Sequence, residues 1–195
     1  MSKIALSRFA SWIEGKLSKD TLLITSLGDS CAAVALGHER TLALDAMGVA
    51  LGLGIGVAMT STLDVLVLET DGSILLDLSA LAAYAEASRR LANFRLAIID
   101  NESYQSAGKF PRPCHTLNWI TLCKAFDLEC EVLSSVEALD GMGGMSDWTA
   151  VTVFKVDEPD IAVDPLPLNG RARASRIRGQ LEQAGIAYPR PATKN

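Results

Sequence analysis

Residues Leu63–Tyr104 have the sequence LDVLVLETDGSILLDLSALAAYAEASRRLANFRLAIIDNESY, and this pattern decides the fold. The apolar run 63–69, rich in Val and Leu, predicts a strand covered on both faces. Asp71-Gly72-Ser73 ends that run. Apolar residues at helical spacing then predict a helix over 74–92, with Ser73 as its cap.

A second apolar run, 95–100, completes a strand–helix–strand unit and ends at Asp100-Asn101. In a parallel sheet such a unit is a right-handed crossover, so the turns after both strands lie at the same edge. Open parallel sheets bind their ligands at that edge. We therefore expect Asp71 and Asn101 to meet there, as oxygen donors suited to Mg²⁺ shared with a phosphate ligand. The simpler alternative is that both residues only make turns.

The rest of the sequence continues this alternation of strands and helices. Helices are predicted over 4–17, 49–59, 116–126 and 134–139, and strands over 21–26, 130–133, 149–156 and the first residues of 40–48. The alternation predicts an α/β fold, a doubly wound parallel sheet with helices on both faces. We assign it to residues 1–168 and expect 169–195 to form a basic C-terminal helix and tail.

Composition places the chain among ordinary globular domains. Its 195 residues are 49% hydrophobic, enough for one domain with a sizeable core. The net charge of −5 argues against nucleic acid as a partner, although 169–195 carry six Arg and Lys residues against one Glu. These cations fit a solvated helix face or, less simply, a contact with an acidic partner. Neither a membrane span nor a signal peptide is indicated, so we expect a soluble, cytoplasmic protein.

Two Gly-containing segments bear on ligand binding. Strand 21–26 runs into Gly28-Asp29-Ser30 and then a helix, which presents free backbone N–H groups to an anion; a plain helix cap explains this turn equally well. In the helix predicted over 49–59, Gly52, Gly54 and Gly56 do not form a dinucleotide-binding fingerprint, because the later Gly or Ala that it needs is absent. Small residues here more simply allow close packing against neighbouring elements.

The central motif resembles that of a known family. Asp71-Gly72-Ser73, followed by a helix, a strand and Asp100-Asn101, resembles the diphosphate- and magnesium-binding motif of thiamine diphosphate enzymes, usually GDGS and NN. The resemblance implies that Asp71, Asn101 and the backbone carbonyl of Ser103 hold Mg²⁺. Thr70 takes the place of the family's first Gly, and Asp100 that of its first Asn.

The decarboxylase branch of this family adds further similarities. Gly28-Asp29-Ser30 is similar to a turn beside the cofactor's diphosphate, and with Gly72 and Ser73 it forms the implied cofactor-binding set. Residues 43–48, ALDAMG, are similar to the GSMG pattern of phosphonopyruvate and sulfopyruvate decarboxylases. By that similarity Asp45, which replaces a Gly, offers its backbone carbonyl to the aminopyrimidine, and Met47 bends the thiamine. The plainer role of Met47 is core filling.

The loop 105–115 resembles the family's YxSTGGQPT segment, here with Lys109 and Arg112 added. Lys109, Arg112 and His115 could face an anionic substrate, although loop cations more often face water.

The resemblance covers roughly residues 22–156. It implies the thiamine diphosphate- and Mg²⁺-binding half of a split 2-oxo acid decarboxylase, most similar to the β-subunit type of the sulfopyruvate decarboxylase family. In this family the catalytic Glu comes from a pyrimidine-binding domain, for which 195 residues leave no room. A partner chain bearing that Glu, an oligomer formed with it and an anionic 2-oxo acid substrate are therefore implied, with no certain catalytic residue in this chain.

Two alternatives stay open. A degenerate, non-catalytic member of the same family would bind the cofactor or a partner, and Asp45, Thr70 and Asp100 favour it. An unrelated α/β enzyme would use Asp29, Asp71 and His115.

Overall fold

The computed structural model describes residues 3–35, 38–114 and 116–157, together with the four helical residues 175, 178, 179 and 182. His115 and most of the predicted basic tail lie outside the described residues, so the division at 168 stays a prediction. None of the helices in the described part of the chain has the length and apolar character needed to cross a membrane.

The core of the fold is a sheet of six parallel strands. Their spatial order is β2 (Thr41–Ala43), β1 (Thr21–Thr25), β3 (Asp64–Thr70), β4 (Phe94–Asp100), β8 (Val151–Lys155) and β7 (Cys130–Leu133). All five pairings are parallel. The chain starts inside the sheet, builds outward to one edge and returns to build the other, so the predicted doubly wound α/β fold is confirmed.

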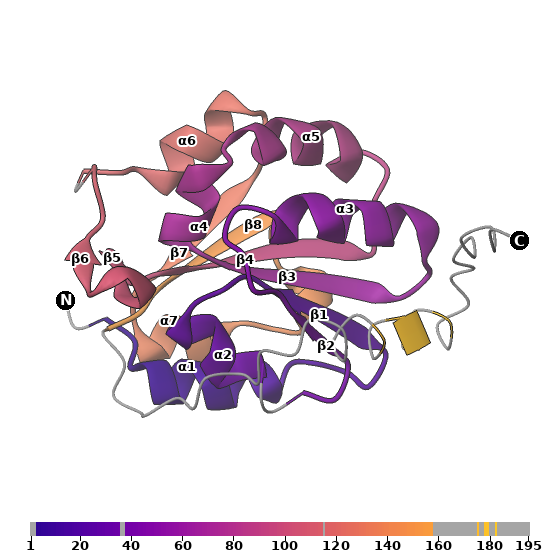
Figure 1. Ribbon diagram of the computed structural model, residues 1–195, viewed down its shortest axis with the longest axis horizontal. Coiled ribbons are helices and arrows are strands. Elements are labelled where there is room, and N and C mark those ends of the chain that lie inside the picture. Colours follow the sequence, from indigo (N-terminus) through magenta and orange to yellow (C-terminus); the bar gives the residue numbers. More distant parts are fainter. Residues whose placement is uncertain are drawn as a thin grey trace, which may run out of the picture.

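Helices cover both faces of this sheet (Figure 1). One face carries α3 (Ala50–Thr60), α5 (Ser79–Ser88) and α6 (Trp119–Ala125), and the other carries α1 (Leu6–Glu14), α2 (Asp29–Ala35) and α7 (Val136–Gly141). The central strand β3 shows why. Val65 and Val67 pack into the first layer, Leu66 and Leu68 pack into the second, and all four are fully buried. A continuous apolar run is what a strand covered on both faces needs.

The predicted helix over 74–92 is wrong in two respects. It is two helices, α4 (Asp71–Leu76) and α5, separated at Asp77, whose backbone is not helical. The cap is Thr70 instead of Ser73, because the Thr70 hydroxyl accepts the backbone N–H of Ser73 at 3.3 Å. Ser73 uses its own hydroxyl to accept the N–H of Gly48 at 2.8 Å. The first helical turn is thereby tied to the segment that follows β2.

The loop predicted over 105–115 begins as a small hairpin. Strands β5 (Ser103–Tyr104) and β6 (Phe110–Pro111) pair antiparallel around the 3₁₀ turn η1 (Gln105–Ala107), and a second such turn, η2 (Met145–Asp147), precedes β8. The hairpin follows β4 directly and therefore lies at the carboxyl edge of the sheet, beside α4.

The glycines of α3 have different surroundings. A Cβ at Gly54 would lie 2.1 Å from Cγ2 of Val67 on β3, so close helix–sheet packing requires glycine there. A Cβ at Gly52 or Gly56 would meet nothing within 4 Å. The close-packing interpretation thus holds for Gly54 and not for its two neighbours.

This contrast gives a matched pair of variants. Gly54→Ala forces its methyl into Val67 and is expected to lower the free energy of unfolding by about 1–3 kcal/mol. Gly56→Ala adds a methyl in open space within a helix and should raise it by about 0.5–1 kcal/mol. Urea denaturation of both variants measures the difference. Equal effects of the two substitutions would contradict the packing described for α3.

Candidate functional site

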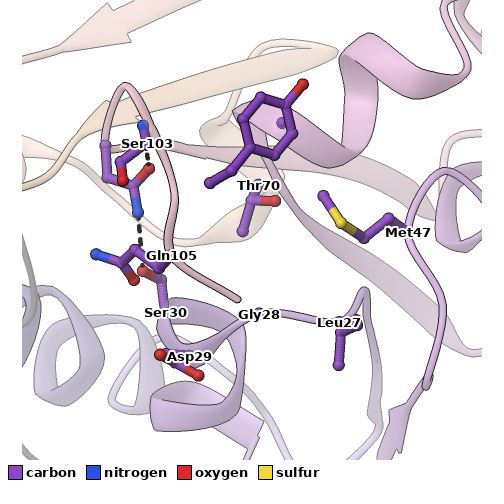
Figure 2. A pocket seen from close by; sticks show the side chains of 11 residues that line it. Leu27, Gly28, Asp29, Ser30, Met47, Thr70, Ser103 and Gln105 are labelled. Atoms are coloured by element: carbon purple, nitrogen blue, oxygen red, sulfur yellow. Dashed lines mark hydrogen bonds between the residues drawn. The ribbon is translucent and has the colours of Figure 1, made fainter. Parts of the chain in front are cut away.

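A pocket opens at the carboxyl edge of the sheet, between the turns that follow β1, β3 and β4 (Figure 2). Seven residues that the sequence predicted for the site line it: Gly28, Asp29, Ser30, Met47, Gly72, Asn101 and Ser103. Leu27, Thr70, Tyr104 and Gln105 complete the lining. Segments far apart in the sequence thus converge where a parallel sheet is expected to bind its ligand.

Three predicted residues do not line the pocket. Asp71 is fully buried, and its Oδ2 accepts the backbone N–H of Glu102 at 3.1 Å. Ser73 is also fully buried and holds Gly48. The Asp45 side chain is exposed on the turn after β2, two residues before Met47. The extra carboxylate of Asp45 therefore lies outside the pocket lining.

Asn101 joins two of the converging turns. Its Nδ2 donates to Oγ of Ser30 at 3.4 Å, which connects the turn after β4 to the start of α2. Its Oδ1 accepts the N–H of Ser103 at 3.0 Å. The amide oxygen that the sequence assigned to a metal thus also closes a local turn.

Arg112 contradicts both expectations for the loop cations, because it faces neither solvent nor an open substrate site. It follows β6, and its side chain is 1% exposed. Its Nε lies 2.6 Å from Oδ2 of Asp71, and its Nη2 lies 3.5 Å from Oδ1 of Asp100. The sequence analysis did not predict this ion pair. The flanking Pro111 and Pro113 stiffen the backbone and were a signal that Arg112 has a fixed position.

Asp100 has partners from two other elements. Lys155 at the end of β8 donates to its Oδ2 at 2.5 Å, and the indole N–H of Trp119 at the start of α6 donates to the same oxygen at 2.5 Å. No motif singled out either residue. Their roles follow from the strand order, which places the end of β8 beside the end of β4.

The two buried carboxyl groups have different proton affinities. Burial, reinforced by the nearby charge of Asp100, raises the pKa of Asp71 to about 7, against the opposing charge of Arg112. Burial would also raise the pKa of Asp100, but the hydrogen bonds from Lys155 and Trp119 and the charges of Lys155 and Arg112 outweigh it and lower that pKa. Asp100 is therefore the more firmly ionised of the two.

The pocket is nearly filled by the protein itself. It encloses about 10 Å³, room for about one water molecule. Tyr104 lies against the backbone of Gly72, since a Cβ at Gly72 would be 2.5 Å from Cε1 of its ring. The hairpin therefore covers the surface that the DGS motif would present to a diphosphate.

The predicted magnesium ligands do not fit a divalent ion in this arrangement. Oδ2 of Asp71 is paired with Arg112, and the amide oxygen of Asn101 is turned to Ser103. Within the described part of the chain, no group of three or more His, Cys, Asp or Glu residues is placed to hold a metal. The cationic partner of Asp71 is a guanidinium.

Comparison with known proteins supports the resemblance of the motifs. The sequence is 38% identical over 65 residues to sulfopyruvate decarboxylase subunit beta of Methanocaldococcus jannaschii, a match that covers 33% of this chain and 34% of that subunit. A solved structure of a candidate thiamin diphosphate-dependent enzyme from Mycobacterium smegmatis superposes with a TM-score of 0.62 at 13% identity. It covers 80% of this chain and 32% of that one. No protein-family model matches.

The chain has the fold of the matched domain of that thiamin diphosphate-dependent enzyme. The matched regions span about a third of the length of either relative. The activity and partners of a whole enzyme therefore belong to the proposals below.

Glu69 is a further buried polar residue near this site that the sequence did not single out. It is fully buried at the end of β3, and its Oε1 accepts the N–H of Leu51 in α3 at 3.1 Å. Burial raises the pKa of this carboxyl above its ordinary value, and the hydrogen bond from the backbone N–H of Leu51 acts in the opposite direction. A raised pKa means that the folded protein holds this proton more tightly than the unfolded chain.

The contribution of this bound proton to the free energy of unfolding is complete below the ordinary pKa of 4.5. It is lost as the pH rises through the pKa of Glu69 in the folded protein. Glu69→Gln keeps the acceptor for Leu51 and never ionises. At pH 7 it should raise the free energy of unfolding by about 1 kcal/mol or more, and the gain should disappear below about pH 4.5. Glu69→Leu, which lacks the acceptor, is the control and should destabilise. Urea denaturation across pH tests both, and a Gln variant less stable than the native chain at pH 7 would refute this account.

Proposed function

We propose that the chain is the thiamine diphosphate-binding half of a split 2-oxo acid decarboxylase of the sulfopyruvate or phosphonopyruvate type. The observation that carries the proposal is the convergence of the turns after β1, β3 and β4 on one pocket, in a fold shared with a thiamine diphosphate-dependent enzyme. The sequence similarity to a decarboxylase subunit supports the reaction class.

In this proposal each predicted residue has a defined task. The turns Gly28–Ser30 and Gly72–Ser73 take the diphosphate, Met47 supports the bent thiamine, and the backbone carbonyl of Asp45 meets the aminopyrimidine. When bound, thiamine diphosphate supplies the nucleophilic carbon and the electron sink for the loss of carbon dioxide from an anionic 2-oxo acid. Mg²⁺ would join Asp71, Asn101 and the Ser103 carbonyl only in a form in which Arg112 has left Asp71.

Cofactor binding requires the hairpin β5–β6 to move. The cavity is far smaller than a diphosphate needs, and Tyr104 and Gln105 of the hairpin region line it. Displacing Tyr104 from Gly72 would free the backbone of the DGS turn. The proposal therefore includes an open form of the hairpin.

The catalytic Glu must come from a second chain, and α3 is the proposed contact with it. This helix contains no charged residue, and it leaves Leu53 and Met59 exposed by 41% and 66%. Val49, just before α3, is 47% exposed, and Leu76 at the end of α4 is 62% exposed. The open sides of Gly52 and Gly56 would let a partner approach the α3 backbone closely. The name of the relative, a subunit beta, supports a multi-chain enzyme.

A second candidate is a non-catalytic member of the same family that binds the cofactor or a partner. The ion pair between Arg112 and Asp71 favours it, because it removes the motif's main metal ligand.

Reconstitution with a pyrimidine-domain chain bearing the missing Glu separates the two candidates. Alone, the chain should bind thiamine diphosphate weakly and decarboxylate nothing. The mixture should bind the cofactor at least about tenfold more tightly, a gain of 1.4 kcal/mol, and decarboxylate an anionic 2-oxo acid such as sulfopyruvate. Titration calorimetry and carbon dioxide release measure the two effects.

Leu53→Glu should prevent assembly, whereas Ile120→Glu, which changes an exposed apolar residue on α6, should not. Decarboxylation by this chain in isolation would refute the split-enzyme proposal. Cofactor binding without activity in every pairing would favour the non-catalytic candidate.

A further inference from the structure

The cation beside Asp71 belongs to the protein chain. Arg112 reaches the site from the segment after β6. Hydrogen bonds from its backbone and from its side chain hold it in this position. Its N–H donates to the carbonyl of Glu102 at 2.8 Å, and its Nη1 donates to the carbonyl of Cys114 at 2.8 Å. With 1% of its side chain exposed, the guanidinium lies beside the carboxylates of Asp71, which follows β3, and Asp100, which ends β4.

The charges around it balance. Three carboxylates are paired with three cations in one connected network, made of Asp71, Asp100, Glu102, Arg112, Lys155 and Lys3. A buried charge is costly unless it is paired, and in this network each carboxylate has a cationic partner without a metal, while Oδ1 of Asp71 and Nε of Arg112 make no hydrogen bond among the described residues. A divalent ion added to it would bring two positive charges next to a guanidinium.

We propose that Arg112 is the resident cation of this site and excludes Mg²⁺ from Asp71. The inference goes beyond the proposed function, because it concerns the bare chain and holds whether or not thiamine diphosphate binds. Oδ1 of Asp71 is buried and has no hydrogen-bond partner among the described residues. Removing the guanidinium leaves Oδ1 of Asp71 without a partner and Oδ2 with only the N–H of Glu102, which frees the carboxylate for a metal, with Asn101 nearby on the next turn.

The test is Mn²⁺ binding to the full chain, followed by electron paramagnetic resonance as a stand-in for Mg²⁺. The native chain should show only weak binding that Asp71→Asn does not alter. Arg112→Met should bind one Mn²⁺ at least tenfold more tightly, and adding Asp71→Asn should abolish the gain. Lys109→Met removes a positive charge from the same loop and is the control; Arg112→Lys keeps the charge at the site. Both should resemble the native chain.

Two results would overturn the proposal. One is a native chain that already binds Mn²⁺ tightly and loses at least tenfold in affinity with Asp71→Asn. The other is a folded Arg112→Met variant, verified by circular dichroism, that gains no Mn²⁺ affinity. If Arg112→Met does not fold, the comparison of the native chain with Asp71→Asn still decides.

The outcome is independent of the proposed function. Failure of thiamine diphosphate to bind, together with the expected Mn²⁺ pattern, would remove the proposed function and leave the role of Arg112 intact. Thiamine diphosphate binding by the native chain, together with tight Mn²⁺ binding to the bare chain that Asp71→Asn weakens at least tenfold, would leave the proposed function intact and remove the role of Arg112.

Discussion

Two carboxylates buried at the ends of neighbouring central strands are the constraint on which this site depends. Asp71 and Asp100 are both fully inaccessible, and they repel each other when ionised. A buried charge left without its partner typically costs about 3–5 kcal/mol, so the fold has to bring cations to this point. Arg112 comes from the segment after β6, and Lys155 comes from the end of β8. Ion pairs thus connect elements at the sheet edge that are far apart in the sequence.

This requirement also sets the state of the pocket. In the arrangement in which Arg112 pairs with Asp71, the hairpin that precedes Arg112 lies close to α4 and Tyr104 covers Gly72. The ion pair and the closed pocket are therefore two aspects of one arrangement. A ligand that moves the hairpin must also supply or relocate the charge that balances Asp71. Opening of this pocket is consequently coupled to the position of the Arg112 guanidinium.

The sequence predicted the sheet well because its strands are uninterrupted apolar runs, a pattern fixed by burial on both faces. The prediction over 130–133 coincides with β7, and β3 and β4 begin and end within one residue of their predicted bounds. Seven predicted site residues converge because strand ends in a parallel sheet must do so. The apolar pattern did not predict the helix break at Asp77 or the cap at Thr70, because each depends on local backbone and side-chain geometry that hydrophobic periodicity does not report. The burial of Arg112 escaped it for a different reason: a charged residue in a loop has no periodic signal, and only the tertiary structure supplies its partners.

The departures from the thiamine diphosphate motif form a connected set, and this bears on what kind of change produced them. Thr70, in place of the first Gly, caps α4. Asp100, in place of the first Asn, adds a carboxylate that receives Lys155 and Trp119 and lies 3.5 Å from Arg112. Arg112 is itself an addition to the loop that resembles the family's segment. Random loss of a metal site would leave an unpaired buried carboxylate, which is costly. Here the added cation Arg112 pairs most closely with Asp71 and the added anion Asp100 pairs most closely with Lys155, so each buried carboxylate has a cationic partner within the chain.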